Sequence, residues 1–183
     1  MAKIALLFAT GTEECEALNV VDILRRAGED LNIVSINETV DVTGAHGIRI
    51  IADETIDKHD FSKDDVLIIP GGNPGAFNIE GHPLAGKAVD DMSKAGKLMC
   101  AICAAPMIYG HKGLLKGRKA CIYPGMEAEL EGAEVSMDKV IRDGNFITSR
   151  GLGTAIPFAL EILAALKGRD AADKMAKSIV FND

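Results

Sequence analysis

Short, continuously apolar runs constrain the fold of this chain more than any other feature. Residues 4–9, 66–69 and 98–102 contain no charged side chain and are rich in Ile, Leu, Val and Ala. Runs of this kind are typical of strands that are buried on both faces of a parallel sheet. Amphipathic segments that suit helices lie between the runs or after them, at 13–27, 83–95, 154–166 and 171–179. The sequence therefore predicts an α/β three-layer sandwich, with a mostly parallel central sheet and helices on both faces.

Two further patterns predict hairpins. Residues 40–43 and 48–52 flank Gly44 and Gly47, and an Asp143-Gly144 turn separates residues 140–142 from 145–148. Residues 31–36 and 119–123 are two more candidate strands, and Thr12 is the expected N-cap of the first helix. The chain shows no internal repeat, linker or low-complexity stretch, so residues 1–183 are predicted to form one domain.

Composition excludes several functional classes. The net charge of −7, the absence of Trp and an aromatic content of 4% argue against a nucleic-acid surface. No apolar run approaches the ~20 residues that a membrane helix requires. The four cysteines occur without a recognisable secretory signal, which indicates reduced thiols and a cytoplasmic protein.

In an open parallel sheet, binding sites gather at the carboxyl ends of the strands. Three loops follow predicted strands in this way, at residues 10–16, 70–73 and 103–106. The third begins with Cys103, which is surrounded by alanines and followed by Pro106 at the expected first turn of a helix. Backbone N–H groups and the helix dipole at such a turn favour a thiolate. The alternative is a buried cysteine with a purely structural role, which composition alone does not separate from a reactive one.

Cys100 and Cys103 also form a C-x-x-C pattern, which is typical of redox pairs and zinc sites. Along an extended strand, three residues at ~3.3 Å each place the two Cα atoms about 10 Å apart. A disulfide needs a Cα separation below about 7 Å, so a redox pair is excluded. A zinc site is disfavoured because the sequence has no second C-x-x-C and no paired histidines.

Four segments in order carry a resemblance to a known family. They are Gly11–Glu16 (GTEECE), Pro70–Asn73 (PGGN), Ala101–Pro106 (AICAAP) and Thr148–Thr154 (TSRGLGT). Together they resemble the ThiJ/PfpI superfamily, and most closely the branch of the human parkinsonism-associated protein deglycase. The resemblance spans nearly the whole chain. It implies a flavodoxin-like fold, a homodimer, and neither a metal nor an organic cofactor.

The resemblance also implies the roles of particular residues. Cys103 matches the nucleophile, Glu16 the carboxylic acid beside it, and Gly72 and Ala104 the backbone donors around the thiol. Asn73 follows in the same loop and is expected to bind substrate. A protonated glutamate can donate a hydrogen bond to a thiolate and then move a proton during reaction. The residues alone do not distinguish Glu16 from its acidic neighbours in the first turn of a helix.

Two departures from the family pattern concern histidines. Tyr123 stands where relatives of the human protein carry a histidine, and Ala104 stands where PfpI-type proteases carry one. Peptide hydrolysis therefore lacks its general base and is not expected. His46 occupies a loop in which family members often place an arginine that reaches the partner subunit's site. We expect Tyr123 and His46 to contribute to substrate binding.

The leading functional hypothesis is a glyoxalase-like or deglycase-like enzyme, a lyase or hydrolase that acts on small reactive aldehydes or glycated substrates through Cys103 and Glu16. The alternative is a non-enzymatic oxidative-stress sensor or redox-regulated chaperone that works through oxidation of Cys103. Among the other cysteines, Cys15 is expected to be partly buried, and Cys100 and Cys121 are expected to lie in the core.

Overall fold

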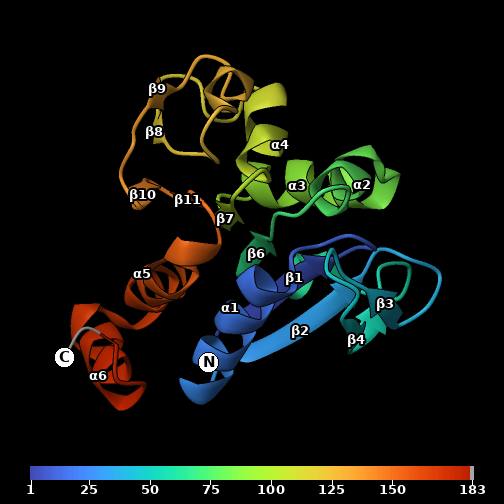
Figure 1. Ribbon diagram of the computed structural model, residues 1–183, viewed down its shortest axis with the longest axis horizontal. Coiled ribbons are helices and arrows are strands. Elements are labelled where there is room, and N and C mark those ends of the chain that lie inside the picture. Colours follow the sequence, from blue (N-terminus) through green and yellow to red (C-terminus); the bar gives the residue numbers. More distant parts are fainter. Residues whose placement is uncertain (182–183) are drawn as a thin grey trace.

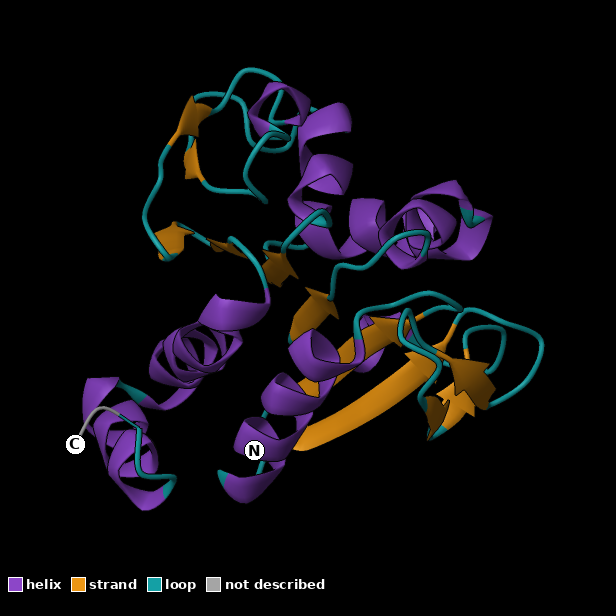
Figure 2. Ribbon diagram, in the orientation of Figure 1, coloured by secondary structure: helices purple, strands orange, loops and turns teal. Residues whose placement is uncertain are grey.

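The computed structural model describes residues 1–181 and confirms the predicted α/β sandwich (Figures 1 and 2). Its central sheet has seven strands in the order β10-β11-β7-β6-β1-β2-β5. All neighbouring strands are parallel except β10 and β11, which form an antiparallel hairpin at one edge. The strands of this sheet are β1 (Lys3–Phe8), β2 (Asp30–Ser35), β5 (Glu54–Thr55), β6 (Val66–Ile69), β7 (Leu98–Ile102), β10 (Val140–Asp143) and β11 (Phe146–Ser149).

Six α-helices cover the sheet, with α1, α5 and α6 on one side and α2, α3 and α4 on the other (Figure 1). Each packs an apolar face toward the strands or toward a neighbouring helix, as their buried residues show. Their bounds are α1 (Glu14–Arg26), α2 (Gly75–Gly81), α3 (Pro83–Lys94), α4 (Pro106–His111), α5 (Ala155–Lys167) and α6 (Arg169–Ser178). Single turns of 3-10 helix occur at Phe61–Lys63, Glu127–Glu129 and Leu152–Thr154.

Strand β1 shows why the apolar runs are continuous. Ile4, Leu6 and Phe8 belong to the core under α1 and α5, whereas Ala5 and Leu7 belong to the core under α2, α3 and α4. Successive side chains of a strand point to opposite faces, so a strand covered on both sides requires apolar residues at every position. The sheet thereby separates two hydrophobic cores.

Both predicted hairpins are confirmed. Strands β3 (Asp41–Thr43) and β4 (Arg49–Ile51) pair antiparallel as a separate two-stranded sheet, and β10 pairs with β11 around the predicted turn. Apart from residues 119–123, the predicted strands and helices are present with their ends shifted by at most about two residues.

The predicted strand at residues 119–123 is the principal difference. Only β8 (Lys119–Ala120) forms, and it pairs with β9 (Glu134–Val135) outside the central sheet. The next backbone groups are bound elsewhere, because the Cys121 N–H donates to Thr148 Oγ1 at 3.0 Å and the Tyr123 N–H donates to the Cys103 carbonyl at 2.9 Å. The apolar segment therefore becomes a buried connection that leads to Cys103.

The N-terminus of α1 also differs from the prediction. Glu13, rather than Thr12, is the N-cap, and its carboxylate accepts a hydrogen bond from the Glu16 N–H at 2.6 Å. The Thr12 hydroxyl accepts from the Ala9 N–H at 2.9 Å, so it closes the turn after β1 instead. Glu16, in the first turn of this helix, lies inside the protein.

Candidate functional site

The site forms at the carboxyl ends of four adjacent strands. Strands β11, β7, β6 and β1 are consecutive neighbours in the sheet and run parallel, so the loops that follow them emerge at the same edge. The loops after β1, β6 and β7 were predicted to carry the site, and the loop after β11 joins them.

Cys103 occupies a left-handed backbone conformation, with φ of 64°, at the turn between β7 and α4. This conformation costs a residue with a side chain roughly 1–2 kcal/mol. Two backbone hydrogen bonds hold it in place: the Cys103 N–H donates to the Ser149 carbonyl at 3.0 Å, and the Cys103 carbonyl accepts from Tyr123. The side chain is half-buried, and the backbone N–H groups of Ala104 and Gly72 lower the pKa of its thiol.

Glu16 lies beside the thiol and is only 1% exposed. One carboxylate oxygen, Oε2, accepts a hydrogen bond from the Gly71 N–H at 2.9 Å. The carboxylate also accepts from the Leu152 N–H and forms a hydrogen bond with the Cys103 side chain. Groups from the loops after β6, β7 and β11 therefore hold one acidic side chain that α1 supplies.

Burial raises the pKa of both ionisable groups, and the charge of Glu16 also acts on Cys103. Burial raises the pKa of Glu16 to about 7, although the hydrogen bonds from Cys103 and Gly71 oppose this change. Burial, followed by the charge of Glu16, raises the pKa of Cys103 to about 12. The backbone donors of the turn lower the pKa of the thiol, as expected, but burial and the charge of Glu16 outweigh them. A proton on Glu16 removes that repulsion, so thiolate formation depends on the protonation of its partner.

Gly71 is the residue that allows this close contact. A Cβ atom at position 71 would lie 2.5 Å from Cys103 Cβ, 2.7 Å from Glu16 Oε2 and 3.0 Å from Cys103 Sγ. Real Cβ atoms do not approach other heavy atoms so closely, so any larger residue would displace the thiol or the carboxylate. Gly71 belongs to the predicted loop, but its role was missed because the expected backbone donors were Gly72 and Ala104.

The other predicted site residues lie at different distances from this pair. Tyr123 is half-exposed, with its ring against Gly151. Asn73 is exposed in the loop after β6. His46 is exposed and contacts Glu14 of the same chain, with Nδ1 3.1 Å from a carboxylate oxygen. The structure therefore places Tyr123 next to the Cys103 backbone and His46 beside the start of α1.

The cysteines differ in accessibility. Cys100 and Cys121 are buried as expected. Cys15 is exposed, which corrects the prediction of partial burial: α1 turns Glu16 inward and therefore turns its neighbour outward.

Leu152 was also missed as a contributor to the site. Its backbone acts on Glu16, and a side-chain pattern carries no signal for a backbone donor.

One group of side chains among residues 1–181 brings metal-ligand atoms together. Oxygen and nitrogen atoms of Glu13, Glu14 and His46 lie within 4.8 Å of one another. Glu14 already accepts hydrogen bonds from the His46 N–H at 2.8 Å and the Ile48 N–H at 3.2 Å. The Glu14 carboxylate therefore already binds the backbone of the β3–β4 hairpin and joins it to α1.

No helix in the described part of the chain is long and apolar enough to cross a membrane.

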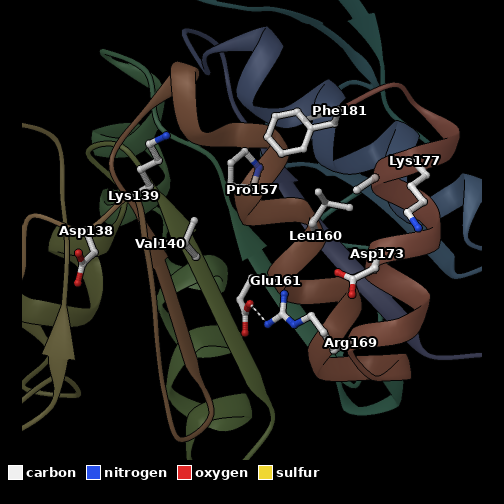
Figure 3. Close-up of a pocket in the computed structure, with 12 residues that line it drawn as sticks. Asp138, Lys139, Val140, Pro157, Leu160, Glu161, Arg169, Asp173, Lys177 and Phe181 are labelled. Carbon is white, nitrogen blue, oxygen red and sulfur yellow. Dashed lines mark hydrogen bonds and ion pairs between the residues drawn. The ribbon is translucent and has the colours of Figure 1, made fainter. Parts of the chain in front are cut away.

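A large hollow lies away from the reactive pair, between β10, α5 and α6 (Figure 3). Its volume is about 790 Å³, and Pro157, Leu160 and Phe181 supply apolar walls. An ion pair between Glu161 and Arg169, 2.5 Å apart, spans part of it. Neither Cys103 nor Glu16 lines this hollow, so its size does not identify the reactive site.

Comparison with known proteins now adds to this geometry. Residues 2–165 match the DJ-1/PfpI family. This chain belongs to that family. The match confirms the resemblance that the four sequence segments indicated.

Relatives of the DJ-1/PfpI family align along almost all of the chain. The "Glutathione-independent glyoxalase DJR-1.2" of Caenorhabditis elegans is 32% identical over 179 residues, which cover 97% of this chain and 95% of that protein. The "Protein DJ-1 homolog B" of Arabidopsis thaliana is 33% identical over 181 residues, 98% of this chain. This chain spans only 41% of the Arabidopsis protein's length. The structure of "Toxoplasma gondii DJ-1, oxidized" matches with a TM-score of 0.96 and 30% identity, and the match covers 100% of both chains.

The coupling of Glu16 and Cys103 predicts how the thiol responds to a substitution. In Glu16→Gln the negative charge that raises the thiol pKa is absent, so alkylation of Cys103 by iodoacetamide above pH 7 should become faster. The measurement is the alkylation rate from pH 5 to 9, followed by mass spectrometry of the Cys103 peptide. Cys15→Ser is a suitable background because Cys15 is exposed. An equal or slower rate in Glu16→Gln at pH 8 would contradict the electrostatic account.

Proposed function

We propose that this protein is a cofactor-independent enzyme that converts small 2-oxoaldehydes such as methylglyoxal into 2-hydroxy acids. The observation that carries the proposal is the contact between Cys103 and Glu16, a nucleophile and a buried carboxyl group whose pKa is raised to about 7. A group with this pKa can both accept and donate a proton near neutral pH.

The first step forms a bond between Cys103 Sγ and the aldehyde carbon. Glu16 takes the thiol proton as the sulfur attacks, and the aldehyde oxygen becomes an oxyanion. The Ala104 and Gly72 N–H groups, which lie at the sulfur, are the available donors to this oxyanion. Return of the proton from Glu16 to the oxygen gives a hemithioacetal.

The second step moves a proton between two carbons. The Glu16 carboxylate removes the hydrogen from the former aldehyde carbon, and the resulting enediol is protonated at the neighbouring carbon. The aldehyde carbon is oxidised to a thioester while the ketone carbon is reduced to an alcohol, so no external oxidant is required. Water then cleaves the thioester, which releases the hydroxy acid and regenerates the thiol.

The name of the Caenorhabditis elegans relative supports this assignment, because that protein is called a glutathione-independent glyoxalase. The same addition and proton transfer on glyoxal-modified amines or thiols would give deglycase activity. The absence of the family histidine limits the proposal to small aldehydes rather than peptides. Tyr123 takes that position, and its backbone N–H holds the Cys103 carbonyl.

Conversion of methylglyoxal to lactate tests the proposed enzyme directly. Wild-type protein should form lactate, Cys103→Ala should form none, and Glu16→Gln should lose at least about 100-fold in kcat because its amide cannot transfer the proton. Cys15→Ser is the matched control, since this thiol lies on the surface of α1 and should not affect turnover. Lactate formation by Cys103→Ala equal to that of the wild type would overturn the proposal.

A second role, as an oxidation sensor or a redox-regulated chaperone, rests on the same pair. A carboxylic acid beside a thiol can donate a hydrogen bond to a sulfinate, the product of two-oxygen addition. The solved structure from Toxoplasma gondii is described as an oxidized form, which supports oxidation chemistry within the family.

Mild peroxide treatment separates this role from unspecific damage. The sensor hypothesis predicts that Cys103 gains two oxygen atoms while the exposed Cys15 and the buried Cys100 and Cys121 remain reduced. Tryptic mass spectrometry at increasing peroxide concentrations measures each site. Oxidation of Cys15 before Cys103 would rule out a dedicated sensor.

A homodimer is the proposed assembly. Leu18 on α1 and Ile48 and Ile51 on the β3–β4 hairpin are exposed, and backbone hydrogen bonds join the hairpin to the start of α1. This adjoining apolar surface suits a second copy, and it would bring His46 toward the partner's site.

Substitution of Ile51, which is 66% exposed, tests this assembly. Light scattering should give the mass of two chains for the wild type and of one chain for Ile51→Asp, because a carboxylate cannot be buried without a partner. Met137→Asp changes an apolar residue of similar exposure, 61%, elsewhere and should remain dimeric. A wild-type mass of one chain at micromolar concentration would exclude the dimer.

A further inference from the structure

Two large apolar side chains near the reactive pair are exposed to solvent. Tyr123 is 50% exposed and Leu152 is 51% exposed. They come from different segments, the connection after β8 and the 3-10 turn after β11. Exposed apolar residues that meet at a site from separate segments are typical of a ligand-binding surface.

Backbone contacts fix both residues to the reactive groups. The Tyr123 N–H donates to the Cys103 carbonyl at 2.9 Å, and the backbone N–H of Leu152 lowers the pKa of Glu16. The Tyr123 ring lies over Gly151: a Cβ at position 151 would be 3.5 Å from Tyr123 Cδ2 and 3.9 Å from Glu16 Oε1. The ring, Gly151 and the carboxylate therefore occupy one small region, and Leu152 follows directly in the chain.

Glu13 and Glu16 place two carboxyl groups in this region, and the exposed His46 lies beside Glu13, with Nδ1 3.7 Å from Oε1. The Glu13 carboxylate is bound to the Glu16 N–H at 2.6 Å, and its charge raises the pKa of Glu16 further. Arg150 is the basic residue nearest in sequence, and its Nη1 donates to the Met137 carbonyl at 3.2 Å. A substrate that carries a carboxylate would therefore meet repulsion from Glu13 and Glu16.

We propose that Tyr123 and Leu152 form an apolar rim that selects neutral 2-oxoaldehydes with a hydrophobic, preferably aromatic, substituent and rejects aldehydes that carry a carboxylate. This inference rests on the proposed function for its substrate class. The aldehyde carbon would meet Cys103 while the substituent packs against the tyrosine ring and the leucine side chain. Aromatic rings add face or edge contacts to the area they bury.

Turnover of three aldehydes tests the selection. The wild type should convert phenylglyoxal with a kcat/KM about tenfold higher than methylglyoxal, and 4,5-dioxopentanoate, a 2-oxoaldehyde that bears a carboxylate, should be the poorest substrate. Leu152→Ser and Tyr123→Ser should each reduce the preference for phenylglyoxal severalfold while methylglyoxal turnover changes less. Leu84→Ser is the matched control, because Leu84 is 42% exposed but lies on α3.

Alkylation of the thiol gives a second readout that requires no turnover. In a Cys15→Ser background, N-phenylmaleimide should react with Cys103 faster than N-methylmaleimide, relative to the same ratio for free glutathione. In Leu152→Ser and Tyr123→Ser, the ratio of the N-phenylmaleimide rate to the N-methylmaleimide rate should approach the ratio measured for glutathione. A raised ratio without any lactate formation would support the rim and refute the proposed enzyme. Ratios that match glutathione and do not respond to either substitution would overturn the rim, whether or not methylglyoxal is converted.

Discussion

A carboxyl group buried against a thiol is the interaction on which the rest of the site depends. Glu16 is almost fully buried, and an isolated charge at such a position would be strongly unfavourable. The protein compensates with backbone N–H groups from Gly71 and Leu152 and with the Cys103 side chain. Because these donors come from three loops, the loops must keep their relative positions for the carboxyl group to remain inside.

The sheet order explains how those positions are maintained. Strands β11, β7, β6 and β1 are parallel neighbours, so the loops at their carboxyl ends are held at the spacing of adjacent strands. The left-handed conformation of Cys103 is stabilised by hydrogen bonds to Ser149 on one side and Tyr123 on the other. The strain at this residue is therefore supported by the β-structure and by the buried segment after β8.

Much of this arrangement could be predicted from sequence, and the exceptions have physical causes. Continuous apolar runs and Gly- or Asp-containing turns identified both hairpins and the strands of the central sheet except β5. Residues 119–123 were wrongly assigned as a strand, because a side-chain pattern does not reveal that the Cys121 and Tyr123 N–H groups bind Thr148 and Cys103. Helix α2 was missed, since glycine at both ends of Gly75–Gly81 hides a short helix.

The candidate site, like the fold, could be predicted from the sequence only in part. Cys103 followed from its turn, and Glu16 followed from the family resemblance rather than from its residue type. The raised pKa of both groups could not be predicted, because it depends on how much water their packing excludes. The exposure of Cys15 is a consequence of helix phase, because Glu16 on the same helix faces inward and its neighbour therefore faces outward.

The groups that act on the thiol and on the carboxyl group include the backbone amides of Gly71, Gly72, Ala104 and Leu152. A backbone amide stays in place when a side chain is exchanged, provided that the new side chain fits. At position 71 only glycine fits, whereas the Leu152 side chain is 51% exposed and can be exchanged without a clash in the core. Evolution can therefore alter what this site recognises at one set of positions while its reactive chemistry is inherited unchanged at another.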